Sequence, residues 1–220
     1  MLITSKSVYL LFGATLLLSA GGLRADYYTG TLSYGDGLYA TQSWAKPATS
    51  ISWTVTNEDP DAPAGFGWKY TYILSVPSKD ISHFIVETSD GENPFTADDL
   101  FGVEGTDAYE VKLFSPGASN PSMPGDLYGV KFDDLSDTDI TVSFYSDRAP
   151  VWGDIYAKGG KDKGKNLLMY NTGFSAVDPV DPPSSGSLAG HLLRPDSVPE
   201  PSLLLLLTLG GLGLLRRRTV

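Results

Sequence analysis

"TSISWTVT", residues Thr49–Thr56, alternates apolar and polar side chains. Ile51, Trp53 and Val55 occupy one set of alternate positions, and serine and threonine occupy the other. Successive side chains of a β-strand point to opposite faces, so this period of two predicts a strand with one buried and one hydrated face. The chain around it should therefore be built from strands.

Similar runs follow along the chain, rich in Val, Ile, Thr and aromatic residues and separated by Gly, Pro, Asp and Asn. Within Asp80–Thr88 both faces are apolar, which predicts a strand covered on both sides. Thr96 is a good N-cap for one short helical turn. Short strands at this spacing predict an all-β fold, a single antiparallel β-sandwich or jelly-roll-like domain over residues 26–177. The predicted strands are Thr49–Thr56, Phe66–Val76, Asp80–Thr88, Tyr109–Phe114, Leu127–Phe132, Ile140–Tyr145, Val151–Ala157 and Leu167–Phe174.

Both ends of the chain carry targeting features. Residues 1–25 are typical of a secretory signal peptide, with Lys6 ahead of an apolar run from Val8 to Ala20. The alternative is a retained N-terminal anchor, but this run is shorter than the ~20 apolar residues that a membrane span needs. Residues 178–197 are rich in Pro, Ser and Gly, which predicts a flexible linker. We therefore expect an exported protein.

The last segment reads "VPEPSLLLLLTLGGLGLLRRRTV", residues Val198–Val220. As a helix, Leu203–Leu215 would reach about 20 Å, less than the ~30 Å hydrocarbon core of a bilayer. Arg216, Arg217 and Arg218 follow it and should hold the extreme C-terminus in the cytoplasm. The segment therefore predicts a weak transmembrane helix that anchors the exported body.

This order of parts resembles the PEP-CTERM sorting signal of Gram-negative bacteria that make exopolysaccharide. The resemblance implies recognition and processing by an exosortase, a membrane-embedded enzyme that acts near the Pro-Glu-Pro. Val198, Pro199, Glu200 and Pro201 would form the recognition motif, and Arg216, Arg217 and Arg218 the membrane-retention cluster. The implied route is a transient inner-membrane anchor, then the cell surface, the outer membrane or the extracellular space. The alternative is an ordinary tail anchor.

Two further stretches, "SDRAPVWGDIYAKGG" at Ser146–Gly160 and "YNTGF" at Tyr170–Phe174, are similar to a recurrent pattern in uncharacterised PEP-CTERM proteins. Similar members share a strand of the type "ISHF", here Ile81–Phe84. This resemblance implies a common family of bodies and carries no activity with it.

Composition excludes several classes of function. The chain has no cysteine, which rules out disulfides, thiolate chemistry and Cys-based zinc sites. Its net charge of −10 argues against nucleic acid or anionic lipid as partners, because phosphate binding needs clustered cations. An acidic body suits a hydrated extracellular protein that attracts divalent cations.

One acidic loop is a candidate calcium site. Asp133, Asp134, Asp137 and Asp139 crowd it, and such clusters can hold calcium in irregular sites. The alternative is a hydrated acidic turn. No other cofactor is expected.

A second candidate is a sugar-binding face. Trp152, Asp154 and Tyr156 alternate with Val151 and Ile155, so two rings and a carboxylate should share one face. If the smaller apolar residues face the core, the aromatic face is exposed and can stack on extracellular polysaccharide. The alternatives are that a neighbouring loop covers Trp152, or that the face is inverted.

Catalysis is not expected. Nucleophilic catalysis needs a base beside the nucleophile, and the chain has two histidines. His83 should be a hydrogen-bonded core histidine, and His191 falls in the predicted linker. The sequence thus predicts a structural or interaction protein of an exopolysaccharide or biofilm layer. The alternatives are a carbohydrate-binding module or a glycan hydrolase that uses paired carboxylates.

Overall fold

The computed structural model describes residues 25–197, so the predicted signal peptide and the segment Val198–Val220 lie outside the described residues. The described chain is all-β, as predicted, with thirteen strands, two 3₁₀ turns and no α-helix. None of its helical turns has the length needed to cross a bilayer. The strands are β1 (Tyr27–Tyr34), β2 (Gly37–Ala40), β3 (Ser50–Thr56), β4 (Trp68–Ser75), β5 (Ile81–Glu87), β6 (Leu100–Glu104), β7 (Ala108–Phe114), β8 (Leu127–Asp133), β9 (Asp139–Ser146), β10 (Ala149–Gly153), β11 (Ile155–Asp162), β12 (Lys165–Asn171) and β13 (Leu192–Ser197); the turns are η1 (Gln42–Trp44) and η2 (Ala97–Asp99).

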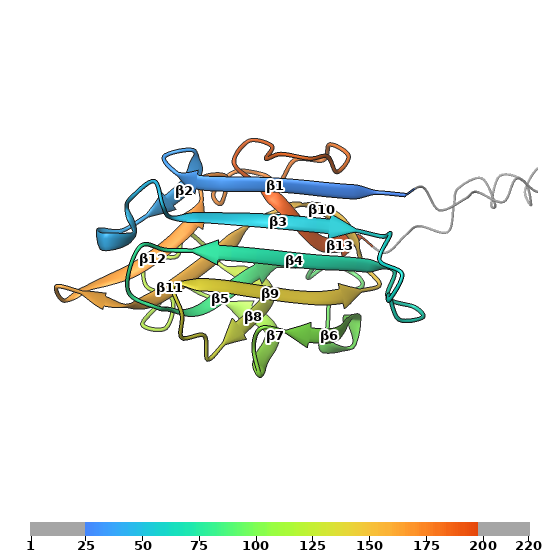
Figure 1. Ribbon diagram of the computed structural model, residues 1–220, viewed down its shortest axis with the longest axis horizontal. Coiled ribbons are helices and arrows are strands. Elements are labelled where there is room, and N and C mark those ends of the chain that lie inside the picture. The colour runs from blue at the N-terminus through green and yellow to red at the C-terminus, as the bar shows by residue number, and fades with distance from the viewer. Residues whose placement is uncertain (1–24, 198–220) are drawn as a thin grey trace, which may run out of the picture.

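Eleven strands form one continuous sheet in the order β6-β9-β4-β3-β1-β2-β12-β11-β5-β8-β7. Neighbours are antiparallel except β1 and β2, which are parallel, so the sheet is mixed. The sheet curls until β1, β3, β4 and β9 lie in front of β12, β11, β5 and β8 (Figure 1). The predicted antiparallel sandwich is therefore replaced by one curled mixed sheet.

The parallel step follows from a tight loop between β1 and β2. Gly35 and Gly37 have φ of 85° and 77°, the left-handed region that glycine adopts without strain. The chain makes a tight loop and then continues in the same direction, so that Ser33 pairs with Gly37 and Tyr34 with Leu38. This step carries the ladder from the front strands to β12 and joins the two layers into one sheet.

Strand β1 was not predicted, and Gly30 at its centre explains why the apolar pattern is weak there. Gly30 is paired directly with Trp53 of β3, and a Cβ atom on Gly30 would lie 2.0 Å from the Trp53 ring. The missing side chain leaves room for the buried indole. The glycine that interrupts the sequence pattern is therefore a packing requirement.

The main core lies between the two layers of the curled sheet. Tyr72 of β4 contacts Phe84 of β5, and Phe144 of β9 contacts Phe132 of β8, with ring centroids 5.6 and 5.7 Å apart. All four rings are buried. Burial of a large apolar side chain contributes about 1.5–3 kcal/mol, so these rings account for much of the stability of the fold.

A smaller cluster covers the outer face of the back layer. Ile85 of β5 and Tyr156 of β11 pack there against Met123, and the Tyr156 hydroxyl donates to the Pro121 carbonyl at 2.9 Å. The prediction that Asp80–Thr88 is covered on both sides is confirmed, because β5 contributes Phe84 to the main core and Ile85 to this cluster.

Strands β10 and β13 form a separate antiparallel ribbon that packs against the main core. Leu192 and Leu193 of β13 are fully buried, and the Tyr72 hydroxyl donates to the Leu193 carbonyl at 2.9 Å. Strand β13 also contacts β3 and β5. The prediction of a flexible linker over residues 178–197 is wrong, because its second half is a core strand. The folded domain runs to Ser197 instead of ending at Val177.

Candidate functional site

Charged side chains from four distant parts of the chain meet beside the β10–β13 ribbon. Glu87 ends β5, Asp154 lies between β10 and β11, and Asn171 ends β12. The segment after β12 contributes the rest. We call this group the His191 cluster; its members are Glu87, Asp154, Asn171, Asp178, His191 and Arg194.

His191 is fully buried at the centre of the cluster. Its Nδ1 lies 3.2 Å from the Leu188 carbonyl oxygen. A carbonyl oxygen only accepts, so Nδ1 must carry the proton in this hydrogen bond, and Nε2 then presents a lone pair. Nε2 lies 3.6 Å from Oδ1 of Asp154 and 3.6 Å from Oδ1 of Asp178, and it makes no hydrogen bond.

Asn171 fixes the position of the Asp154 carboxylate. Its Nδ2 donates to Asp154 Oδ1 at 2.6 Å and to the Gly190 carbonyl at 2.8 Å. Its Oδ1 accepts from the backbone N–H of Ile155 at 2.9 Å. One buried amide therefore links the end of β12 to Asp154 and to the loop that carries His191.

Arg194 is the only guanidinium of the cluster, and three carboxylates surround it. Its nitrogens lie 3.3 Å from Glu87, 3.1 Å from Asp178 and 2.9 Å from Asp196. Counted with Asp154, four carboxylates share one arginine and one histidine. Buried negative charge is costly unless it is compensated, so this excess defines the electrostatics of the site.

Burial shifts the pKa of two of the carboxyl groups. Desolvation raises the pKa of Glu87 to about 8, although Arg194 acts in the opposite direction. Desolvation also raises the pKa of Asp154 to about 6; the hydrogen bond from Asn171 opposes this shift, and the charge of Asp178 adds to it. The cluster as built therefore holds protons more tightly than free carboxylates do.

Two glycines make room for the cluster. A Cβ atom on Gly153 would lie 2.0 Å from Arg194 Nε, and one on Gly173 would lie 2.4 Å from the His191 ring. Gly153 and Asp154 belong to the stretch Ser146–Gly160, and Asn171 and Gly173 to the stretch Tyr170–Phe174. The fold thus brings together the two stretches that carry the sequence resemblance: Asn171 of one donates to Asp154 of the other, and His191 lies beside them.

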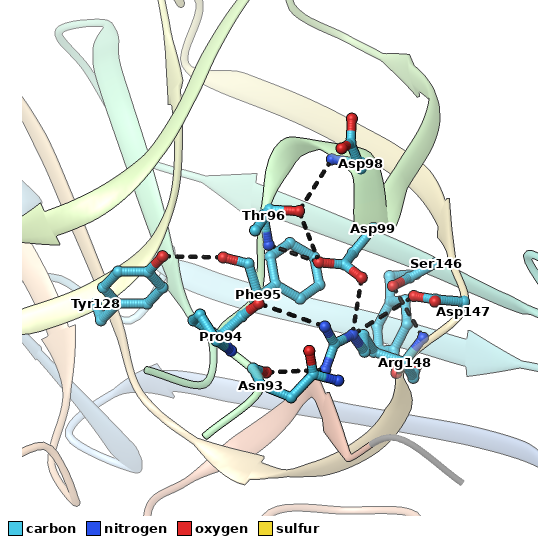
Figure 2. Close-up of polar contacts among 11 residues, drawn as sticks. Asn93, Pro94, Phe95, Thr96, Asp98, Asp99, Tyr128, Ser146, Asp147 and Arg148 are labelled. Carbon is cyan, nitrogen blue, oxygen red and sulfur yellow. Dashed lines mark hydrogen bonds and ion pairs between the residues drawn. The ribbon is translucent and has the colours of Figure 1, made fainter. Parts of the chain in front are cut away.

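A second buried arginine lies in a different environment (Figure 2). Arg148 donates from Nε to Asp99 at 2.9 Å, from Nη1 to the Asn93 carbonyl at 3.2 Å and from Nη2 to the Pro94 carbonyl at 3.4 Å. We call these residues, together with Thr96, the Arg148 network. Thr96 caps η2, as predicted, and its backbone N–H donates to Asp99 at 2.6 Å.

The Asp99 carboxylate of this network stays ionised. Desolvation raises the pKa of Asp99, but the hydrogen bonds from Arg148 and Thr96 together outweigh it and hold the pKa below its ordinary value. In the Arg148 network the arginine is paired with Asp99, and each of its three guanidinium nitrogens donates a hydrogen bond. Its role is to fix the chain around η2 against the end of β9.

The predicted sugar-binding face is not exposed. Trp152, Asp154 and Tyr156 are all buried, and the two rings lie in different clusters, Trp152 in the main core and Tyr156 on the outer face of the back layer. The prediction that they form one exposed face is wrong, because Val151–Ala157 is not one strand. The chain leaves the β10–β13 ribbon at Gly153 and joins the main sheet at Ile155.

The four aspartates of the predicted calcium loop do not converge. Asp133 pairs with Lys131, Asp137 accepts from the backbone of Thr138, and Asp134 lines an open hollow with Glu104. In residues 25–197 the one group of three possible metal ligands within 4.8 Å of one another is Asp154, Asp178 and His191. Asp139, the fourth residue of the loop, is not part of it.

Only one of the two histidines lies where the sequence assigned it. His83 is buried on β5, as predicted, but its Nε2 makes no hydrogen bond. Burial lowers the pKa of His83 to about 4, with Lys131 and Lys158 adding to the effect. His191, assigned to the linker, is the more deeply buried of the two. Residues 178–190 are rich in Pro, Ser and Gly, and this composition led to the assignment of His191 to a linker. The apolar pair Leu192 and Leu193 beside His191 was a usable sign of burial.

Comparison with known proteins gives one result. A model of the PEP-CTERM protein-sorting motif matches residues 197–218, and comparisons with curated proteins and with solved structures found no match. The matched segment begins at the last residue of β13, so the motif follows the folded body without a linker. The chain therefore carries the PEP-CTERM sorting motif, which marks an exported protein for processing at the membrane by an exosortase.

Proposed function

We propose that the protein is a non-enzymatic component of an extracellular polysaccharide layer, released from the membrane by exosortase action near Pro199–Pro201. The observation that carries this proposal is the sorting motif at residues 197–218, placed directly after a folded all-β body. The body is the part that reaches the layer, and the motif is its means of delivery.

The properties of the body suit an extracellular location. It has no cysteine, so its stability depends on the aromatic core and on buried ion pairs such as that of Arg148 with Asp99. The net charge of −10 over the whole chain favours hydration. It also favours neutral or cationic glycans, or acidic glycans bridged by divalent cations, over direct binding to polyanions.

We assign no catalysis to the body. Among residues 25–197, no hydrogen bond joins the ring of either histidine to a serine or threonine hydroxyl, which a nucleophile–base pair would require. His191 faces carboxylates on one side and a backbone carbonyl on the other. This arrangement suits ion binding better than proton transfer to a nucleophile.

A carbohydrate-binding role stays a second candidate because of one exposed ring pair. Tyr39 of β2 is 44% exposed and stacks on its cross-strand partner Tyr170 at 4.7 Å. Rings held in this way can stack on sugar C–H faces. We propose this pair, in place of Trp152 and Tyr156, as the sugar contact of the body.

The test is to follow the protein through the fractions of its host. We expect it in the polysaccharide layer, with an intact mass showing loss of the segment that contains Arg216, Arg217 and Arg218. A double substitution, Pro199→Ala with Pro201→Ala, should leave the uncut chain in the membrane fraction. The matched control, Pro182→Ala with Pro183→Ala, changes two prolines of the folded body and should be processed as the parent is. A mature protein that still ends in Val220 contradicts the proposal.

The ring pair is tested separately with the host's matrix polysaccharide. Tyr39→Ala should weaken retention a few-fold, because a lost aromatic contact costs about 1 kcal/mol. Tyr27→Ala, which removes another exposed ring from β1, is the control. Equal retention of both variants and the parent would leave the layer role without a contribution from this pair.

A further inference from the structure

We propose that Asp154, Asp178 and His191 bind a divalent metal ion of the zinc class, which closes the segment 178–197 onto the body. This inference is independent of the proposed function. It concerns residues that sequence reasoning had assigned to a sugar-binding face and a linker.

The first observation is the convergence of acceptor atoms. The hydrogen bond to Leu188 places the proton of His191 on Nδ1, so the lone pair of Nε2 faces Oδ1 of Asp154 and Oδ1 of Asp178 at 3.6 Å each. Three electron-rich atoms at this distance repel one another unless a cation lies between them.

The second observation is that His191 Nε2 is buried without a partner. A buried polar atom that makes no hydrogen bond costs about 1–3 kcal/mol and needs an explanation. Nε2 points at the two carboxylates, so a metal ion bound there would satisfy it. The ring nitrogen and the two oxygens all lie within 4.8 Å of one another.

The third observation is the charge of the surroundings. Asp154, Asp178 and Asp196 share a single guanidinium, that of Arg194. An added divalent cation would reduce this excess, whereas the Arg148 network needs none. The charge balance therefore favours a cation over a neutral ligand.

The geometry indicates which cation. Zinc bonds to nitrogen and carboxylate oxygen are about 2.0–2.2 Å long, so ligand atoms of a tetrahedral site lie about 3.4 Å apart, close to the 3.6 Å seen here. A set of one imidazole and two carboxylates suits Zn²⁺ better than Ca²⁺, which takes six to eight oxygens. Three protein ligands leave a fourth position for water.

The supporting contacts of a metal site are also in place. Leu188 orients the imidazole through Nδ1, and Asn171 orients Asp154 through its amide. Such hydrogen bonds fix metal ligands and their tautomers. Asp178, with a side chain 28% exposed, gives the ion a route from solvent.

The bound ion would link two parts of the chain. Asp154 lies between β10 and β11, whereas Asp178 and His191 flank the loop that leads into β13. Because β13 ends where the sorting motif begins, the ion would hold the last strand in place beside the segment that the exosortase recognises. The site would thus secure the C-terminal edge of the domain.

The experiment is a Zn²⁺ titration of the exported protein, purified from its host without a histidine tag and stripped with chelator. We expect one ion per chain by calorimetry. The melting temperature should rise by about 5 °C or more at a hundredfold excess over the dissociation constant. Ca²⁺ at the same concentration should have a much smaller effect.

Two variants and two matched controls locate the site. Asp178→Asn keeps an acceptor for Arg194 and should weaken zinc binding at least tenfold, and so should His191→Gln. Asp181→Asn removes an exposed carboxylate of the same segment, and His83→Gln removes the other buried histidine; both should bind as the parent does. If His191→Gln fails to fold, Asp178→Asn decides.

Three results would overturn the proposal. The first is that the parent binds no zinc at millimolar concentration. The second is that folded Asp178→Asn binds zinc as tightly as the parent. The third is that Asp181→Asn loses affinity as much as Asp178→Asn, which would show nonspecific binding to an acidic surface.

Discussion

The Arg148 network and the His191 cluster each bury one arginine, but they differ in charge balance. Arg148 meets Asp99 and two carbonyl oxygens, and every nitrogen of its guanidinium donates a hydrogen bond (Figure 2). Arg194 is shared among three carboxylates, while His191 beside it faces two carboxylate oxygens without a hydrogen bond. Burial of charge is common to both. The excess of carboxylates over cations, together with the unpartnered His191 Nε2, distinguishes the region that can take up a cation from the one that only holds the fold.

The most severe test of this comparison removes the segment that carries half of the His191 cluster. A fragment of residues 25–177 lacks β13 and with it Leu192, Leu193 and Arg194. Loss of one buried leucine alone costs about 2–5 kcal/mol, and whole domains are stable by only about 5–15 kcal/mol. We therefore expect no cooperative melt for this fragment by circular dichroism.

The matched control is the fragment of residues 25–197, which should melt cooperatively as a β protein. If the shorter fragment melts at the same temperature, β13 is an accessory strand. The His191 cluster would then be a surface feature and no longer part of the core.

The next largest effect is expected at the balanced site. Arg148→Met leaves Asp99 as a buried carboxylate without its cation, and breaking a buried pair in this way costs about 3–5 kcal/mol. Urea unfolding at pH 7 measures the loss. Zinc should not restore it, because the Arg148 network has no excess of acceptors. A loss below about 1 kcal/mol would show that the network is not structural.

A pH series separates the two regions in another way. Burial raises the pKa of Glu87 to about 8, so between pH 6.5 and pH 8 the folded protein holds a proton that an unfolded glutamate has released. Stability must then fall as the pH rises through this window, by about 1.4 kcal/mol per unit and about 2 kcal/mol in total. The groups that face Glu87 are Arg194, Asp178 and Asp154. His83 and Asp154 titrate largely below the window, with pKa values of about 4 and about 6.

The measurement is urea unfolding of chelator-treated protein at the two pH values. Glu87→Gln should abolish most of the fall and leave the protein more stable at pH 8. Glu110→Gln, on β7 and with a half-exposed side chain that pairs with Lys112, should retain the parent's slope. If the parent is equally stable at both pH values, Glu87 is ionised throughout and Arg194 compensates it fully.

The sequence predicts some regions of this molecule well because their pattern is local. The alternation in Thr49–Thr56 is the pattern of β3, and the cap at Thr96 is the pattern of η2. Prediction from the sequence fails where tertiary packing, and no local pattern, determines the structure. Gly30 interrupts β1 because Trp53 needs the space, and Pro195 lies in β13 because a two-stranded ribbon leaves one side of that strand unpaired.

The candidate site was harder to predict for a related reason. Asp154 and His191 are 3.6 Å apart because β10 pairs with β13, and that register follows from the burial of Leu192 and Leu193. No local period encodes it. The wrong sugar-binding face has the same origin, since alternation within Val151–Ala157 holds only if the chain stays in one strand, and it changes sheet at Asp154.

The smallest effect is expected from Asp147, which tests whether the Arg148 network is complete. Its carboxylate lies 3.6 Å from Arg148 Nε, but its side chain is 48% exposed, and Asp99 already accepts from that nitrogen at 2.9 Å. Exposed ion pairs contribute about 0–1 kcal/mol, so Asp147→Asn should change the free energy of unfolding at pH 7 by less than about 0.5 kcal/mol. Desolvation and the charge of Asp99 also raise the pKa of Asp147, so its negative charge is not favoured at this position. A loss above about 1 kcal/mol would mean that Arg148 needs both carboxylates. The contrast with Arg194, which three carboxylates surround, would then rest on His191 alone.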